Sequence, residues 1–304
     1  MTTPRLAVLP EGRGAFLADA VREGGGEVVG VGDAEGVVWS DPKDAAGLRQ
    51  VLDEHPDIRW VQLPWAGIEP FVDVLDDDHV WTCGKGVYAE PVAEHALALA
   101  LGGMRAIGHY ARQRTWTGPV GRNLLGATVT ILGGGEITAS LVRLLGPFDA
   151  TVRVVRRHVS AMPGVDEVVA SDDLHRLLPD TDVLFLALAL TDETVGIVGA
   201  AELDLLPDHA WIVNVARGQH VDTDALVAAL EAGRIGGAAL DVTDPEPLPD
   251  DHPLWSRDDV LISPHTANTP EMGRPLLARR VTDNVRRWAA GEELLGPVHT
   301  ALGY

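Results

Sequence analysis

The sequence predicts an α/β protein built from two units, each with a parallel β-sheet covered by helices. Short apolar runs alternate with segments of helical length along the whole chain, a pattern typical of parallel sheets. One long apolar stretch near residue 92 separates an earlier series of such runs from a later one. The 304 residues, 46% of them hydrophobic, suffice for two hydrophobic cores.

The first unit is predicted from five apolar runs. Its strands are expected at Leu6–Leu9, Glu27–Val31, Val37–Trp39, Trp60–Leu63 and Val80–Cys83. Gly14–Glu23 and Lys43–Glu54 lie between these runs and have the length and spacing of helices. Because the strands are separated by helix-length segments, a parallel sheet is favoured over a sandwich.

The second unit begins with a long helix. The Glu90-Pro91 step suits a helix start and predicts a helix over Val92–Gln113. Its strands are expected at Thr128–Leu132, Thr151–Val155, Val183–Leu188, Trp211–Val215, Gly237–Asp241 and Val260–Ser263, and its last helix at Pro275–Ala290. Six strands with intervening helices match one doubly wound domain of the dinucleotide-binding type.

The composition excludes several classes of protein. Twenty-four basic residues against 45 acidic ones give a formal net charge of −21, which repels phosphate backbones, so nucleic-acid binding is not expected. No apolar run approaches the length of a membrane span, about 20 residues. Cys83 is the only cysteine and indicates a reducing, cytoplasmic compartment. The 11 histidines show no recurring ligand spacing, so no metal site is expected.

A glycine-rich turn predicts a dinucleotide site. Gly133-Gly134-Gly135 follows a predicted strand and runs into Glu136 and Ile137 at the start of a helical pattern. Such a turn brings bare backbone N–H groups and a helix N-terminus to a pyrophosphate. Thr138 stands where the third glycine of the G-x-G-x-x-G fingerprint is usual, so the helix and the strand are expected slightly further apart.

Two adjacent arginines favour NADP(H) over NAD(H). An acidic residue about 20 positions after the glycines normally binds the ribose 2′-hydroxyl of NAD. Here the corresponding residues are Arg156 and Arg157, with no carboxylate. Two guanidinium groups can hold a 2′-phosphate through bidentate, charge-assisted hydrogen bonds.

Three side chains near predicted strand ends have the chemistry that a 2-keto acid requires. Arg217 can hold a carboxylate and polarise a carbonyl, since its guanidinium is always charged. His265 can exchange one proton near neutral pH. Glu246 can orient the imidazole and stabilise its protonated form. The carboxyl edge of an open parallel sheet is where ligands bind.

The chain resembles the D-isomer-specific 2-hydroxyacid dehydrogenases. The resemblance covers nearly the whole chain and is most specific over Asp182–Ala267. Its motifs are Leu188–Thr194, Asn214–Gly218, Val221-Asp222, Leu240–Val242, Pro245–Leu248 and Pro264-His265. It implies that Arg217 binds the substrate, that His265 is the acid/base and that Glu246 is its partner. It also implies cofactor contacts from Leu188, Val215, Ala216, His265 and Asp241, the last with the nicotinamide amide.

The same resemblance implies a domain division and an assembly. Residues 1–94 with 287–304 would form a flavodoxin-like substrate domain, and residues 95–286 the Rossmann-like dinucleotide-binding domain, with substrate in a cleft between them. Trp65, Ala66 and Gly67 match the loop that binds the substrate carboxylate. A homodimer is expected, because members of the family pair through the cofactor domain.

The arginine pair resembles the glyoxylate/hydroxypyruvate reductase branch, so a small 2-keto or 2-hydroxy acid is the expected substrate. Glu246 argues against formate, because the formate dehydrogenases of the family have glutamine at that position. Two alternatives stay open. One is an NAD-linked D-2-hydroxyacid dehydrogenase with another substrate, and the other is a dinucleotide-sensing binding protein like the corepressors of the family.

Overall fold

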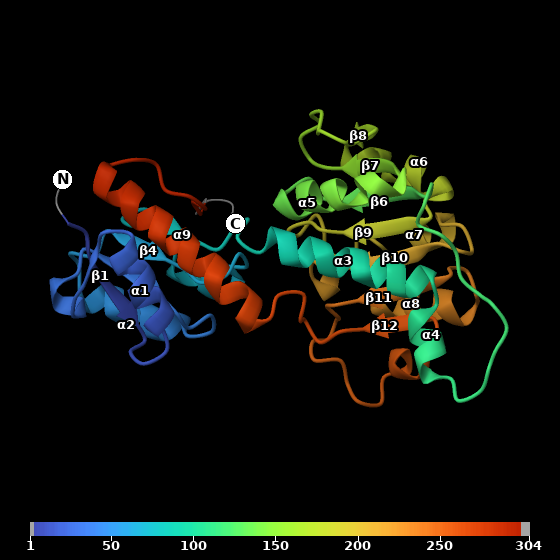
Figure 1. The fold of residues 1–304 in the computed structure, drawn as a ribbon, viewed down its shortest axis with the longest axis horizontal. Coiled ribbons are helices and arrows are strands. Elements are labelled where there is room, and N and C mark those ends of the chain that lie inside the picture. Colours follow the sequence, from blue (N-terminus) through green and yellow to red (C-terminus); the bar gives the residue numbers. More distant parts are fainter. Residues whose placement is uncertain (1–2, 299–304) are drawn as a thin grey trace. The chain divides into compact units, whose positions relative to one another are not determined.

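The structure is a computed structural model that describes residues 3–298, and it consists of two compact units (Figure 1). One unit comprises the residues up to Tyr88 together with those from Thr269 onwards, and the other comprises Ala89–Asn268. These limits differ from the predicted domains, whose second boundary lay after residue 286. The reason is the packing of helix α9 (Pro270–Ala290) on helix α1 (Ala15–Glu23) in the first unit, where Thr282 Oγ1 donates to the carbonyl of Ala20 at 3.1 Å.

The first unit contains a parallel sheet in the order β2-β1-β3-β4-β5, counted over the described residues. Its strands are β1 (Arg5–Leu9), β2 (Glu27–Val28), β3 (Gly36–Trp39), β4 (Trp60–Gln62) and β5 (Val80–Thr82). The sheet has an apolar core that includes Leu48 and Leu52 of helix α2 (Ala45–Glu54) and Phe71 of the 3-10 segment Glu69–Val74. Trp60 stacks on Trp288 of α9, with 5.5 Å between ring centroids.

The second unit contains a longer parallel sheet, in the order β12-β11-β10-β9-β6-β7-β8 over the described residues. Its strands are β6 (Thr128–Leu132), β7 (Thr151–Val155), β8 (Glu167–Val169), β9 (Val183–Leu186), β10 (Trp211–Asn214), β11 (Gly237–Leu240) and β12 (Val260–Ile262). The doubly wound arrangement predicted from the sequence is therefore confirmed. The edge strand β8 was not predicted, because it is only three residues long and includes a glutamate.

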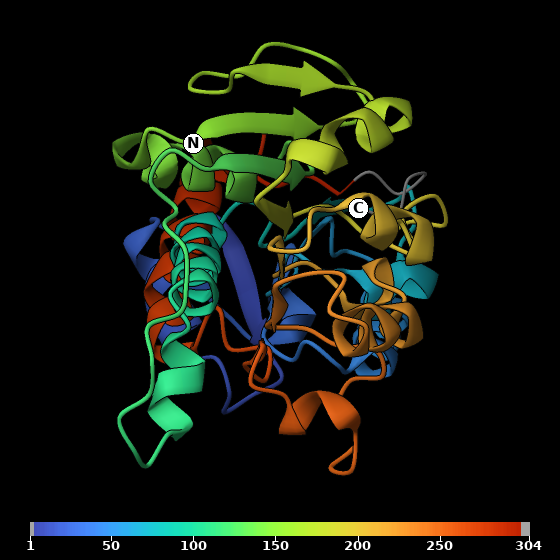
Figure 2. The ribbon, with the colours of Figure 1, turned by 90° about the vertical axis from the view of Figure 1, so that its right-hand side faces the viewer.

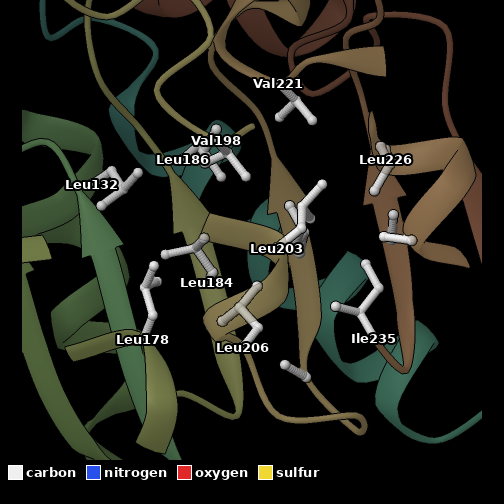
Figure 3. Packing of buried hydrophobic residues seen from close by; sticks show 14 of the residues in the cluster. Leu132, Leu178, Leu184, Leu186, Val198, Leu203, Leu206, Val221, Leu226 and Ile235 are labelled. Atoms are coloured by element: carbon white, nitrogen blue, oxygen red, sulfur yellow. The ribbon is translucent and has the colours of Figure 1, made fainter. Parts of the chain in front are cut away.

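Helices cover both faces of the second sheet. Helices α3 (Ala89–Met104) and α5 (Glu136–Leu145) lie along one face, as Figures 1 and 2 show. On the other face the short helices α6 (Leu174–Leu177) and α7 (Ala200–Leu205) and the helix α8 (Thr223–Glu231) pack against a second core cluster. In Figure 3 Leu184, Leu203 and Leu226 lie in this cluster among other leucine, isoleucine and valine side chains. Both faces are buried, which explains the continuous apolar runs of these strands.

The prediction of one continuous helix over Val92–Gln113 is wrong. It divides into α3 and α4 (Ile107–Arg112), because Ala106 between them has a left-handed backbone with φ of 53°. Near this break, a Cβ on Gly103 would lie 2.3 Å from the ring of Trp211. Glycine therefore allows the end of α3 to approach β10 closely, at a cost in helix propensity. Among residues 3–298, no helix is both long enough and apolar enough to cross a membrane.

Candidate active site

The glycine turn after β6 has the geometry of a dinucleotide site. Gly133 has φ of +104°, and a Cβ there would lie 2.3 Å from the carbonyl oxygen of Ala187, so only glycine fits. Gly135 precedes the first residue of α5, and a Cβ at this position would meet no other atom within 4 Å. The backbone is thus open beside a helix N-terminus that no side chain caps. These features fit the pyrophosphate of a bound dinucleotide, held by the N–H groups around Glu136 and Ile137.

Thr138 suits this turn despite the missing third glycine. Its side chain is fully buried, and its hydroxyl donates to the carbonyl of Gly133 at 2.9 Å. The hydroxyl thereby satisfies a carbonyl of the turn and links the first turn of α5 to the end of β6. The threonine contributes a hydrogen bond that a glycine could not make.

The two arginines after β7 differ in their surroundings. Arg156 lies over the glycine turn, since a Cβ on Gly134 would be 2.7 Å from its Nε. Arg157 is exposed and its Nη2 donates to Oε2 of Glu193 at 2.6 Å. Arg156 is therefore the guanidinium that lies against the glycine turn, whereas Arg157 already has a carboxylate partner.

Arg217 follows β10 in a loop that Asn214 holds. The amide of Asn214 donates to the carbonyl of Arg217 at 2.8 Å and accepts from the N–H of Ala216 at 3.0 Å. A Cβ on the next residue, Gly218, would lie 1.9 Å from the carbonyl oxygen of Thr243. The predicted cofactor residues Val215 and Ala216 lie in this loop, and Leu188 follows β9, the neighbouring strand. Parallel strands thus bring these residues to one edge of the sheet.

His265 and Glu246 form a hydrogen-bonded pair. Nδ1 of His265 lies 2.8 Å from Oε1 of Glu246, and both side chains are about half exposed. Because Nδ1 is occupied by the carboxylate, Nε2 is the ring atom that can exchange a proton with a ligand. His265 has φ of 52°, and its N–H donates to the carbonyl of Asp241 at 2.7 Å. A left-handed non-glycine residue is uncommon, and such strain is concentrated at functional sites.

Asp241, directly after β11, anchors the loop that carries His265 through hydrogen bonds. Its Oδ1 accepts from Ser263 Oγ at 2.6 Å and from the N–H of Thr266 at 2.9 Å, and its Oδ2 accepts from the N–H of Ala267 at 3.0 Å. His95 Nε2 of α3 lies 3.2 Å from Oδ1. Burial alone would raise the pKa of Asp241, but the hydrogen bonds from these four groups together lower it.

Both carboxylate oxygens of Asp241 thus have internal donors, and they fix the backbone on either side of His265. Asp241 was predicted to contact the nicotinamide amide. In the structure its contacts within the chain position the loop that carries His265, and a contact with the nicotinamide stays a prediction.

Sequence reasoning missed three residues of this region. His95 and Ser263 share a hydrogen bond of 2.9 Å and both reach Asp241, although 168 positions separate them. His220 is fully buried close to Arg217, and its Nδ1 is 2.9 Å from the carbonyl oxygen of Thr194. Burial lowers the pKa of His220, and the charge of Arg217 acts in the same direction. A histidine within a run of apolar residues was the available signal for His95.

The predicted substrate loop lies in the first unit, after β4. Trp65 is exposed at 38%, and its ring is 5.2 Å from that of Tyr88, while Ala66 is exposed and Gly67 half-buried. Within residues 3–298 no group of three or more histidine, cysteine or acidic side chains could hold a metal ion.

Comparison with known proteins gives a consistent result. A family model described as D-isomer specific 2-hydroxyacid dehydrogenase, NAD binding domain, matches residues 95–267. Glyoxylate/hydroxypyruvate reductase A of Salmonella paratyphi B is 38% identical over 58% of this chain, a match that spans 56% of the reductase.

The solved structures whose alignment with this chain spans the whole of both chains include the following two. One is a D-isomer specific 2-hydroxyacid dehydrogenase from Xanthobacter autotrophicus Py2 in complex with NADPH and MES, with 28% identity and a TM-score of 0.85. The other is an NADPH-dependent glyoxylate/hydroxypyruvate reductase from Sinorhizobium meliloti in complex with NADP and sulfate, with 25% identity and a TM-score of 0.81.

Proposed function

Because the chain belongs to the D-isomer specific 2-hydroxyacid dehydrogenases and is therefore an oxidoreductase, we propose that it reduces a small 2-keto acid of the glyoxylate or hydroxypyruvate type with NADPH. The observation that carries this proposal is the 2.8 Å pairing of His265 with Glu246, in the same unit as the open glycine turn. An acid/base pair and a dinucleotide site are the two requirements of hydride transfer to a carbonyl.

In the proposed reaction the chain binds and orients the substrate and supplies a proton to it. Arg217 holds the substrate carboxylate and polarises the carbonyl, with Trp65, Ala66 and Gly67 as further proposed substrate contacts. The bound NADPH supplies a hydride to C2 of the keto acid. Nε2 of protonated His265 gives its proton to the carbonyl oxygen, which yields the 2-hydroxy acid and a neutral imidazole. Glu246 orients the ring through Nδ1 and stabilises its charged form before transfer.

The preference for NADPH is proposed to depend mainly on Arg156. Its side chain lies against the glycine turn, whereas Arg157 forms an ion pair with Glu193. Complexes with NADPH or NADP in relatives support the same choice. A glutamine at position 156 should weaken NADPH binding about tenfold or more and leave NADH binding nearly unchanged, since only NADPH has the 2′-phosphate.

A homodimer is proposed, with the segment 105–125 in its interface. Ile107, Trp116, Val120 and Leu125 of this segment are exposed, Trp116 completely. The segment also has four arginines and no acidic residue, in a chain with a net charge of −21, so it complements a second copy. A cytoplasmic location is also proposed, and the single, buried Cys83 supports it.

The proposed function is tested by nicotinamide oxidation with glyoxylate and hydroxypyruvate, with NADPH and NADH compared side by side. Faster oxidation with NADPH is the expected outcome. His265→Ala should reduce turnover by roughly 10²–10⁴-fold, the usual contribution of a general acid, and bind NADPH like the wild type. Wild-type turnover by this variant would refute the role of His265. Binding of NADPH without oxidation of it by the wild type would instead support a dinucleotide sensor.

A further inference from the structure

We propose that Glu193 is a specificity-determining residue for the cofactor, because its carboxylate competes with the 2′-phosphate of NADPH for Arg157. Nη2 of Arg157 donates to Oε2 of Glu193 at 2.6 Å, in an ion pair between the loops that follow β7 and β9. The inference rests on the proposed function, since the glycine turn must bind a nicotinamide dinucleotide. Glu193 opposes the preference for NADPH that Arg156 is proposed to provide.

The topology of the sheet brings this ion pair to the glycine turn. The order β9-β6-β7 places the loops after β9 and β7 on either side of the turn that follows β6. On the β9 side, a Cβ on Gly133 would lie 2.3 Å from the carbonyl oxygen of Ala187. On the β7 side, a Cβ on Gly134 would lie 2.7 Å from Nε of Arg156. The glycine turn is therefore in close contact with both loops, and the ion pair joins these same two loops.

The 2′-phosphate of NADPH is expected at the end of β7. In dinucleotide-binding domains the residue after the second strand contacts the ribose 2′-hydroxyl, and an arginine nearby accommodates a 2′-phosphate. Here β7 is the second strand, and Arg156 and Arg157 follow it. A phosphate bound by Arg157 would meet the carboxylate of Glu193 on the same guanidinium. Two anions then compete for one cation.

The loop that carries Glu193 has a backbone fixed by hydrogen bonds. The N–H of Thr191 donates to Oγ1 of Thr194 at 2.8 Å, and the N–H of Thr194 donates to the carbonyl of Thr191 at 2.9 Å. The hydroxyl of Thr194 donates to the carbonyl of Ala189 at 2.9 Å. Because the turn is held in this way, the carboxylate of Glu193 is presented to the guanidinium without further ordering of the loop.

The exposure of the ion pair allows a cofactor to displace the carboxylate. The side chains of Arg157 and Glu193 are 49% and 74% exposed, and exposed ion pairs contribute little to stability. A phosphate monoester has more negative charge than a carboxylate and three strong acceptor oxygens, so it can replace Glu193 on Arg157. Only NADPH bears the cost of this displacement, because NADH has no 2′-phosphate. Glu193 is therefore expected to lower the affinity for NADPH and leave that for NADH unchanged.

Fluorescence titration of the full chain with NADPH and with NADH, at one ionic strength, tests the inference. Glu193→Gln should bind NADPH about three- to tenfold more tightly than the wild type and bind NADH with unchanged affinity. Asp192→Asn is the matched control, since it removes the same charge from the neighbouring exposed carboxylate, which is not the partner of Arg157. This control should bind both dinucleotides like the wild type.

Adenosine 2′,5′-bisphosphate and 5′-AMP extend the test to ligands without a nicotinamide, so the outcome does not depend on turnover. Glu193→Gln should bind the bisphosphate more tightly by the same factor as NADPH, and 5′-AMP with unchanged affinity. In an Arg157→Gln background most of this gain should be lost, because the contested guanidinium is absent. Circular dichroism should show that all variants fold, since the altered side chains are exposed.

Equal NADPH affinity in the wild type and in Glu193→Gln would overturn the inference. An equal gain for NADH, in Asp192→Asn or in the Arg157→Gln background would overturn it as well, because the effect would then not depend on the 2′-phosphate and Arg157. If the wild type binds NADH more tightly than NADPH, the proposed preference is wrong, and the gain of Glu193→Gln for NADPH still decides this inference. A wild type that binds neither dinucleotide would contradict the proposed function and the role of Glu193 together.

Discussion

Replacement of Asp241 by asparagine should loosen the loop that carries His265. The wild-type carboxylate accepts hydrogen bonds from Ser263, Thr266 and Ala267 and contacts His95, all with a side chain that is 2% exposed. An asparagine can keep its oxygen toward Ser263 and Thr266, but its NH₂ group then faces the N–H of Ala267.

The magnitude follows from this geometry. One hydrogen bond to a charged acceptor is lost and one buried donor is left unpaired, which costs about 2–3 kcal/mol. For a unit of this size each kcal/mol lowers Tm by about 2–4 °C, so the midpoint of the second unit should fall by about 4–12 °C. Turnover should fall as well, because the backbone on both sides of His265 loses an anchor.

The lowered pKa of Asp241 also predicts how the difference in stability between the wild type and Asp241→Asn changes with pH. Because the folded-state pKa of Asp241 is lowered, its stabilising effect is complete above the pKa of an unfolded aspartate, about 3.9. This effect is lost as the pH falls through the lower, folded pKa. The difference in Tm between the wild type and Asp241→Asn should therefore be constant near neutral pH and shrink below about pH 4.

Thermal unfolding followed by circular dichroism between about pH 3 and 8 measures both effects. Asp258→Asn is the matched control, since Asp258 is an exposed carboxylate of the same unit with ion pairs longer than 3.4 Å, to His109 at 3.5 Å and Arg112 at 3.6 Å. The reasoning is refuted if Asp241→Asn unfolds within about 1 °C of the wild type at neutral pH, or if the difference between them is the same at every pH.

Three further substitutions have defined outcomes. Gly133→Ala should abolish measurable NADPH binding in a fluorescence titration, because its Cβ would lie 2.3 Å from the carbonyl oxygen of Ala187. An unchanged affinity for NADPH would contradict the proposed role of the glycine turn. Gly218→Ala should lower Tm and turnover together, since its Cβ would lie 1.9 Å from Thr243 O; an unchanged Tm would contradict this close packing. Glu246→Gln should lower kcat about tenfold or more without changing NADPH affinity, because the amide can orient the imidazole ring but cannot stabilise its positive charge. An unchanged kcat would contradict the role of Glu246.

The sequence predicted most of the strands because buried parallel strands have a local signature. Thr128–Leu132 and Thr151–Val155 have the predicted bounds, since each is rich in β-branched residues and is followed by a glycine or an arginine. Edge strands were less predictable. β2 covers only Glu27–Val28, although the apolar run continues to Val31, because pairing with β1 ends there.

Helix limits that depend on tertiary contacts could not be predicted. The last helix was expected over Pro275–Ala290. It begins at Pro270, and Pro275 lies inside it. The break at Ala106, where the backbone is left-handed, had no signal in the apolar pattern of the sequence either.

The chemistry of the candidate site was visible in the sequence, but its supports were not. The residue types of Arg217, Glu246 and His265 are those that the proposed reaction requires, and the hydrogen bond between the last two became visible only in the fold. The network around Asp241 joins α3, β11 and the loop after β12. No local pattern connects residues so far apart, because the parallel crossovers alone bring them together.

The distribution of charge is compatible with the proposed binding of anionic ligands by so acidic a chain. Beyond about 8 Å, exposed charges are screened at physiological ionic strength, so most of the 45 acidic residues act weakly on a ligand at the sheet edge. At the sheet edge of the second unit, Arg156 lies against the glycine turn that precedes the N-terminus of α5, and Arg217 follows β10. These groups act at contact distance, where screening is small. The acidic surface therefore repels polyanions that must lie across it, while the proposed dinucleotide and keto acid would meet Arg156, Arg217 and the N-terminus of α5 at short range.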